Sequence, residues 1–179
     1  MSGLKTAVNS ADHHMGKVHS PIVLVEYGDY ECPYCGRAYP LIKRLLHEKG
    51  DEFNFVFRNF PLREIHPYAY VSAITAEAAG KQGKFWEMHD LIFENQEKLN
   101  PDFLLSLSRI LHLDSGQFTK DSASEDVKDK IETDFEGGIR SGVNGTPSFF
   151  INGKSLQTYD ETYESLLKAI LKEASIIQH

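Results

Sequence analysis

Apolar residues along this chain repeat with two different periods, and the changes of period mark its elements. The run from Ile22 to Tyr27 is short and apolar on both faces, which predicts a buried strand. Apolar positions three and four residues apart follow Cys35, which predicts a helix that ends near Gly50. Aromatic residues alternate with other residues from Phe53 to Phe57, which predicts a second strand. Strand, helix and strand in this order imply a right-handed parallel crossover.

Strand signals are absent between about residues 66 and 140, where the apolar spacing is that of helices. The expected helices cover 69–79, 85–93, the stretch after Asn100-Pro101, and 127–139. Asn100 suits the cap position of a helix, and Pro101 suits the first helical position because no N–H donor is needed there. We therefore expect a helical block of roughly 75 residues in the middle of the chain.

The last part of the chain predicts a hairpin and a helix. Residues 148–151 and 154–157 flank Asn152-Gly153, a strong signal for a tight hairpin turn. An apolar stripe that begins at Tyr163 predicts the final helix. The central sheet is thus expected to contain residues 22–27, 53–59 and 148–157, in an α/β domain.

Residues 1–20 show no period, and we expect them to form an N-terminal arm. The remaining residues, 21–179, then form a single domain with a helical insert at about 66–140. A length of 179 residues with 41% hydrophobic and 25% charged residues is that of one globular domain. These values argue against a disordered chain.

Charge and hydropathy exclude several functions. The formal net charge is -7 and no long basic run occurs, so nucleic acid is not an expected partner. No apolar run approaches the roughly 20 residues that span a bilayer, so no membrane segment is expected. The N-terminus has no signal-peptide pattern, which predicts a cytoplasmic protein, or a periplasmic one if a leader has been removed. No dimerisation segment is visible, and we expect a monomer.

Both cysteines of the chain lie in one motif, Cys32-Pro33-Tyr34-Cys35, where a strand is followed by a helix. The first turn of a helix has unpaired N–H groups and a partial positive charge, which stabilise a thiolate. Cys32 is therefore expected to have a lowered pKa and to be the nucleophile. Cys35 lies one turn further on the same face, within reach for a disulfide. The nearby Asp29 and Glu31 add negative charge and oppose this effect, and the sequence alone does not decide which of the two effects is larger.

Two readings without redox chemistry compete for the cysteine pair. A C-x-x-C motif is also half of a zinc site, but the chain has no second cysteine pair, and only His13 and His14 are available to complete four ligands. Two cysteines in a helix can also be inert structural thiols. The agreement of strand, turn, helix and spacing favours a redox pair, with no metal.

Three stretches of the sequence resemble the DsbA-like branch of the thioredoxin superfamily. These are VEYGDYECPYCGRAYP (25–40), EAAGKQGKFWEMHDLIFENQ (77–96) and GVNGTPSFFING (142–153), and the resemblance extends from about Asp12 to the last helix. It implies a thioredoxin fold with an inserted helical subdomain. It also implies a thiol–disulfide oxidoreductase with Cys32 as the attacking and Cys35 as the resolving thiol, and with no cofactor besides that pair.

The resemblance assigns roles to three further residues. In similar proteins a cis proline packs against the cysteine pair, which implies a cis Thr146-Pro147 bond that presents the Thr146 backbone to a substrate strand. An acidic residue occupies the position of Glu26, six residues before Cys32. A carboxyl buried there has a raised pKa and can take the proton of Cys35 during resolution. The competing reading of Glu26 is a strand-end residue paired with a lysine.

The substrates are expected to be protein or peptide thiols and disulfides, exchanged with the thioredoxin system or with glutathione as redox partner. Tyr30 and Tyr34 flank the thiol and are candidates for contact with a peptide. The Pro-Tyr pair between the cysteines also occurs in many glutaredoxins, so a glutathione-linked reductase stays open as an alternative. A second alternative is a peptide-binding module without redox activity. The cytoplasmic location favours a reductant, whereas the DsbA-like resemblance favours an oxidant.

Overall fold

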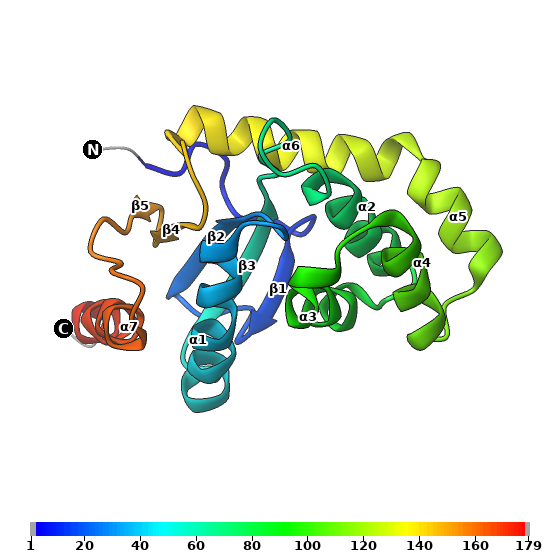
Figure 1. Cartoon of the computed structure of the whole chain (residues 1–179). Coiled ribbons are helices and arrows are strands. Elements are labelled where there is room, and N and C mark those ends of the chain that lie inside the picture. Colours follow the sequence, from blue (N-terminus) through cyan, green and yellow to red (C-terminus); the bar gives the residue numbers. More distant parts are fainter. Residues whose placement is uncertain (1–2, 178–179) are drawn as a thin grey trace.

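A mixed five-stranded sheet lies at the centre of the computed structural model, which describes residues 3–177 (Figure 1). The strands are β1 (His13–Gly16), β2 (Val23–Gly28), β3 (Asn54–Asn59), β4 (Ser148–Ile151) and β5 (Lys154–Ser155). Their order across the sheet is β1-β3-β2-β4-β5. β2 and β3 are parallel, as a strand–helix–strand crossover requires, and the other neighbours are antiparallel.

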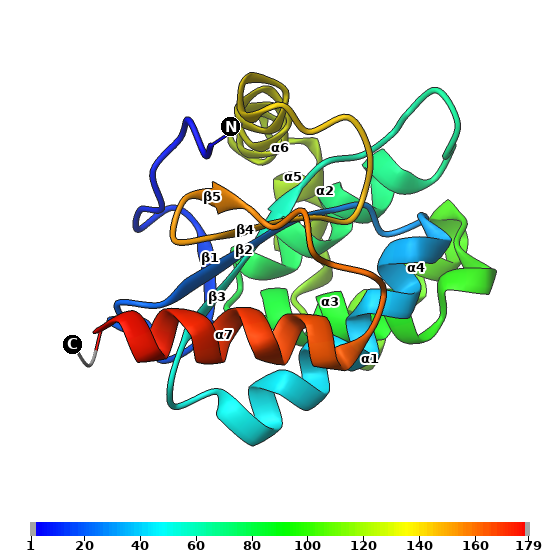
Figure 2. The same ribbon diagram turned by 90° about the vertical axis from the view of Figure 1, so that its left-hand side faces the viewer.

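Helices cover both faces of the sheet. Figure 2 shows α1 (Pro33–Lys49) and α7 (Tyr163–Ile177) on one side and α6 (Glu125–Ser141) on the other. The strand residues divide between the two faces by alternation. Leu24, Phe55, Phe57 and Phe149 belong to the larger apolar core on the α1 side, whereas Val25, Tyr27, Val56 and Phe150 belong to the smaller core on the α6 side. Glu26 lies two residues after Leu24 on β2, so its side chain is on the same face of the sheet, the α1 side.

The helical insert extends from α2 to α6 and packs around α2. Its elements before α6 are α2 (Ala69–Gly80), α3 (Phe85–Glu94), the short 3₁₀ helix η1 (Gln96–Lys98), α4 (Pro101–Ile110) and α5 (Ser115–Ala123). The Asn100 side chain caps α4 by accepting a hydrogen bond from the N–H of Phe103 (3.0 Å). This fold confirms the predicted thioredoxin-like α/β class with an inserted helical subdomain.

The boundaries differ from the predicted ones in three places. The stretch after Asn100-Pro101 forms two helices, α4 and α5, because the chain turns at His112, which has a positive φ of 54°. α6 begins at Glu125, two residues earlier than expected, with the Ser124 side chain as its cap. β5 is shorter than predicted and ends at Ser155.

The expected N-terminal arm is partly a strand of the sheet, which corrects the predicted boundary at residue 20. β1 pairs antiparallel with β3, and His13 lies opposite Phe57. Its sequence, HHMG, lacks an apolar alternation because it forms an edge strand with half-buried side chains. Next to β1, the Asp12 carboxylate accepts hydrogen bonds from the buried Arg58 guanidinium at 2.8 and 2.9 Å. These contacts join the N-terminal segment to the domain.

Within residues 3–177, no helix is both long and apolar enough to cross a membrane.

Candidate active site

Cys32 occupies the cap position at the start of α1. Its backbone is extended (φ -68°, ψ 121°), and Pro33 takes the first helical position, where an N–H donor is not required. The carbonyl of Cys32 accepts the first helical hydrogen bond, from Gly36 N–H (3.0 Å). The Cys32 sulfur therefore lies at the end of the helix where free N–H groups and the helix dipole favour negative charge. The sequence predicted this placement.

The two thiols have opposite acid–base properties. The pKa of Cys32 is lowered to about 5, mainly by a hydrogen bond from the Cys35 thiol. Burial opposes this effect, and the N–H groups of Cys35 and Tyr34 add to it. The pKa of Cys35 is raised well above its usual range, mainly by burial and by its hydrogen bond to Cys32. At neutral pH the geometry thus favours a thiolate at Cys32 and a protonated thiol at Cys35.

The loop before β4 faces the reactive thiol. The Cys32 sulfur lies 3.3 Å from the Thr146 carbonyl oxygen, to which it donates a hydrogen bond when the thiol is protonated, although 114 residues separate them. The Thr146–Pro147 peptide bond is cis. The Thr146 hydroxyl is buried and has no oxygen or nitrogen partner among the described residues. The resemblance implied that Thr146 and Cys32 belong to one site, and in the structure the two residues are in contact.

The residues that precede Cys32 are fixed by a buried carboxylate. Asp29 accepts hydrogen bonds from Glu31 N–H (2.8 Å), Leu62 N–H (2.9 Å) and His66 Nδ1 (2.8 Å). These donors offset the negative charge that the sequence analysis set against the Cys32 thiolate. The Asp29 N–H in turn donates to the Cys35 sulfur (3.4 Å). Asp29 therefore positions the turn that carries both thiols.

Gln96 links the helical insert to the active-site turn, and the sequence analysis missed it. Its amide donates hydrogen bonds to the carbonyl oxygens of Tyr30 and Cys32, both at 2.8 Å. Gly36 makes room for it, since a Cβ there would lie 2.2 Å from the Gln96 side-chain oxygen. The only local signal was a glycine in the first turn of a helix, which the sequence did not otherwise explain.

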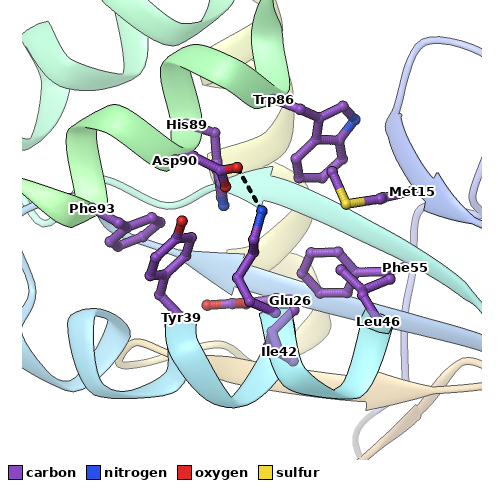
Figure 3. A pocket seen from close by; sticks show the side chains of 11 residues that line it. Met15, Glu26, Tyr39, Ile42, Leu46, Phe55, Trp86, His89, Asp90 and Phe93 are labelled. Atoms are coloured by element: carbon purple, nitrogen blue, oxygen red, sulfur yellow. Dashed lines mark hydrogen bonds and ion pairs between the residues drawn. The ribbon is translucent and has the colours of Figure 1, made fainter. Parts of the chain in front are cut away.

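Glu26 is buried in the middle of β2, between Phe57 of β3 and Phe149 of β4. The side chain is 4% exposed, and none of the described residues forms a hydrogen bond with it. Burial raises the pKa of Glu26 to about 8, and the charge of Cys32 adds to this effect. Figure 3 shows its carboxyl group between α1 and α3. The alternative reading, a strand-end glutamate paired with a lysine, does not agree with this placement.

The two tyrosines beside the thiols lie in different environments. Tyr34 is half exposed on the first turn of α1, and the Arg37 guanidinium lies over its ring at 4.2 Å. Tyr30 is 1% exposed and packs among core residues, including Phe93, with its hydroxyl 3.0 Å from His89 Nδ1. The structure thus leaves Tyr34 as a candidate for substrate contact and removes Tyr30.

The two histidines that were considered for a zinc site lie on β1. His13 Nε2 is 2.8 Å from Glu77, and His14 contacts Asn54 and the Asn9 carbonyl oxygen. Residues 3–177 contain no group of three or more histidine, cysteine, aspartate or glutamate side chains arranged to hold a metal ion.

Residues 8–172 of the chain match a family model described as Thioredoxin. Among solved structures, a thioredoxin-like oxidoreductase from Silicibacter pomeroyi has a TM-score of 0.79 and 26% identity, over 93% of this chain and 94% of that one. DsbA2 from Pseudomonas aeruginosa has a TM-score of 0.72 and 25% identity, over 92% and 95%. These matches confirm the DsbA-like resemblance.

A curated relative, the Na⁺/H⁺ antiporter NhaA 1 of Salinispora arenicola, is 46% identical over 143 residues. The match covers 80% of this chain and 22% of that protein. The chain therefore spans about a fifth of the length of the relative, and the antiporter name belongs to the whole of that protein.

Proposed function

The chain belongs to the thioredoxin family, and from this premise we propose that it is a thiol–disulfide oxidoreductase acting on cysteines of protein or peptide substrates. The observation that carries the proposal is the asymmetry of the two thiols. Cys32 has a pKa lowered to about 5, mainly by its hydrogen bond with Cys35, and Cys35 has a raised pKa, mainly because it is buried. Exchange needs one thiolate that attacks and a second thiol that reacts only after the first is bonded.

The reaction follows from this asymmetry. The Cys32 thiolate attacks a substrate disulfide, forms a mixed disulfide and releases one substrate thiolate. Cys35 then gives its proton to the Glu26 carboxylate and attacks the Cys32 sulfur, which releases the second substrate thiolate. Two electrons pass from the enzyme dithiol to the substrate disulfide. The same steps in reverse oxidise a substrate dithiol, and the cysteine pair is the only redox group that the reaction needs.

The substrate segment lies against the loop that carries Thr146 and the cis Pro147. The Thr146 carbonyl oxygen, which lies 3.3 Å from the Cys32 sulfur in the free protein, is then available to the backbone of an extended peptide. The exposed ring of Tyr34 contacts the same peptide from the other side of the thiol. Thr146, Pro147 and Tyr34 are thus the proposed substrate-binding residues.

The low pKa of Cys32 favours the oxidising direction. A stabilised thiolate stabilises the reduced protein and makes the pair a better electron acceptor. Among thioredoxin-fold proteins a lower pKa of the attacking cysteine accompanies a less negative reduction potential, so a Cys32 pKa of about 5 predicts a potential less negative than about -270 mV. Glutathione or a thioredoxin-type protein is the proposed exchange partner.

The test uses the full chain with one thiol removed at a time. Cys35→Ser is expected to accumulate a mixed disulfide with a protein substrate that carries a disulfide, because the Cys32 thiolate attacks that disulfide and the resolving thiol is absent. Cys32→Ser is the matched control and is expected to form no adduct and to lose at least about 1,000-fold in turnover. Non-reducing electrophoresis and mass spectrometry of the adduct measure both results.

The outcomes separate the three candidate functions. Turnover of a glutathione mixed disulfide faster than that of a protein disulfide would identify the glutathione-linked reductase. No adduct with Cys35→Ser, together with peptide binding by Cys32→Ser, would identify the peptide-binding module and contradict the proposal. Equilibration in glutathione buffers, followed by counting of alkylated thiols, measures the potential. A value near -270 mV would refute the oxidising direction.

A further inference from the structure

A small cavity lies beside Glu26, between α1 and α3 (Figure 3). Its volume is about 10 Å³, which is room for one water molecule. Aromatic and aliphatic side chains form most of its wall. The polar exceptions include Glu26 from β2, Lys43 from α1 and Asp90 from α3. Three separate elements therefore bring one carboxyl, one ammonium and one carboxylate group to the same cavity.

Two of these groups have unused hydrogen-bonding capacity. No described side chain bonds the Glu26 carboxyl, and the buried Oδ1 of Asp90 has no partner among the described residues. The other oxygen of Asp90 accepts a hydrogen bond from Lys43 Nζ at 2.6 Å. This ion pair is partly exposed, with 42% of the Lys43 and 26% of the Asp90 side chain accessible. The pair is thus in contact with solvent as well as with the cavity.

We propose that Lys43 and Asp90 are positioning residues that set when Glu26 holds a proton, acting on it across this cavity. The inference rests on the proposed function, in which Glu26 receives the proton of Cys35. The two opposite charges lie 2.6 Å apart, and with the pair intact the raised pKa of Glu26 is caused by burial and by the charge of Cys32. Removal of either charge exposes the other to the Glu26 carboxyl.

Several other titratable groups face Glu26 and must be considered. From α1 these are Cys32, Cys35 and Tyr39, from α3 His89, and from the connecting segments Tyr30 and Tyr159. His89 has a pKa lowered to about 3, mainly by burial, and the pKa values of the three tyrosines are raised by burial, so these four are neutral near pH 8. In the mixed disulfide Cys32 carries no charge. Lys43 and Asp90 then remain as the charges closest to the cavity.

Removal of one or the other charge of the pair is predicted to shift the midpoint of the Glu26 titration in opposite directions. Lys43→Met leaves the Asp90 carboxylate alone, which disfavours a second negative charge and moves the midpoint of Glu26 titration up by about 0.5–1 pH unit. Asp90→Asn leaves the Lys43 ammonium alone and moves the midpoint down by a similar amount. A packing defect would not give opposite signs in the two variants.

The experiment follows the reduced full-length protein with Ellman's reagent in a stopped-flow instrument. Cys32 attack releases the first thionitrobenzoate, and Cys35 attack on the resulting mixed disulfide releases the second. The rate of the second release is measured against pH, and its midpoint in the wild type is expected near pH 8. The infrared band of the protonated Glu26 carboxyl, identified by its loss in Glu26→Gln, gives the same midpoint without any turnover.

Lys49→Met is the matched control, because Lys49 is also on α1 and pairs with a carboxylate, Glu52, at 2.8 Å. It is expected to leave both midpoints within about 0.2 pH unit of the wild type. Shifts of equal sign in Lys43→Met and Asp90→Asn, or shifts no larger than that of the control, would overturn the inference. If the wild type released no second thionitrobenzoate, the proposed function would be refuted instead. The infrared titration would still show whether Lys43 and Asp90 act on Glu26.

Discussion

Two glutamates of this protein are buried to a similar degree, but the pKa of one is raised and the pKa of the other is lowered. Glu26 is 4% exposed and Glu77 is 6% exposed. Glu77 accepts hydrogen bonds from His13 (2.8 Å) and Asn59 (2.6 Å), whereas Glu26 accepts none from the described residues. Burial raises the pKa of both, but in Glu77 the bond with His13 and nearby charges reverse the effect and lower the pKa.

A buried carboxyl group can stabilise the fold through its partners, as at Glu77, or take part in proton transfer, as proposed for Glu26. Around Glu77 the charged groups are paired, including Lys130 with Asp134 at 2.6 Å. The contacts of this cluster connect β1, β3, α2 and α6. A paired buried charge needs its partner for stability. Glu26 has no such partner among the described residues, so its carboxyl can exchange a proton with another group. This difference, rather than burial as such, marks Glu26 as a candidate for proton transfer.

Removal of the unpaired carboxyl is expected to have the largest effect on stability. The folded pKa of Glu26, about 8, is above its unfolded value of 4.5, so the native state holds the proton more tightly. The contribution of the protonated Glu26 to the stability of the native state is therefore fully present below about pH 4.5 and is lost as the pH rises through about 8. Glu26→Gln cannot ionise and should be more stable than the wild type by up to about 4 kcal/mol at pH 8.

Urea unfolding of the oxidised proteins at pH 4.5 and pH 8 measures this gain, since the thiols then do not titrate. Glu52→Gln, in an exposed pair with Lys49, serves as control and should change stability by less than about 1 kcal/mol at either pH. A Glu26→Gln protein with the same unfolding free energy as the wild type at both pH values would argue against a raised pKa.

Removal of the partner of Glu77 should make that glutamate resemble Glu26. His13→Leu keeps an apolar side chain against Phe85 but deletes the hydrogen bond to Glu77. We expect a loss of about 2 kcal/mol at pH 7, because a buried carboxylate loses a donor. The loss should shrink at lower pH, where Glu77 becomes protonated in the variant. Thermal unfolding across pH 5–8 tests this, with the exposed His19→Leu as control; a loss independent of pH would indicate a packing defect.

The smallest effect is expected at the active-site turn. Gln96→Leu leaves the Tyr30 and Cys32 carbonyl oxygens without the amide that joins them to the insert. We expect a loss of about 1 kcal/mol in unfolding free energy, as for one or two neutral hydrogen bonds. Glu97→Ala, at the exposed neighbouring position, should leave the stability unchanged within about 0.5 kcal/mol. Equal losses in both variants would show that Gln96 only supports η1.

The prediction of the fold succeeded where the signals were local. The apolar stripe after Cys35, the Asn100 cap and the turn at Asn152-Gly153 depend on residues within a few positions of one another. The prediction failed for β1, because the HHMG sequence becomes a strand only when β3 offers its edge. It also missed α5, which the turn at His112 separates from α4.

For the site, the sequence by itself determined the position of Cys32 and Cys35 at the start of a helix, which favours a thiolate at Cys32. It also placed Glu26 in a buried strand. The sign of the Cys32 pKa shift was decided by the tertiary structure, mainly through the hydrogen bond from the Cys35 thiol. Only the tertiary structure decided that Glu26 has no hydrogen-bond partner within residues 3–177, that Gln96 holds the turn, and that Lys43 and Asp90 meet at one cavity. Local elements depend on neighbouring residues and can be predicted from them. The partners of a buried polar group come from distant segments, and their meeting depends on how the elements pack.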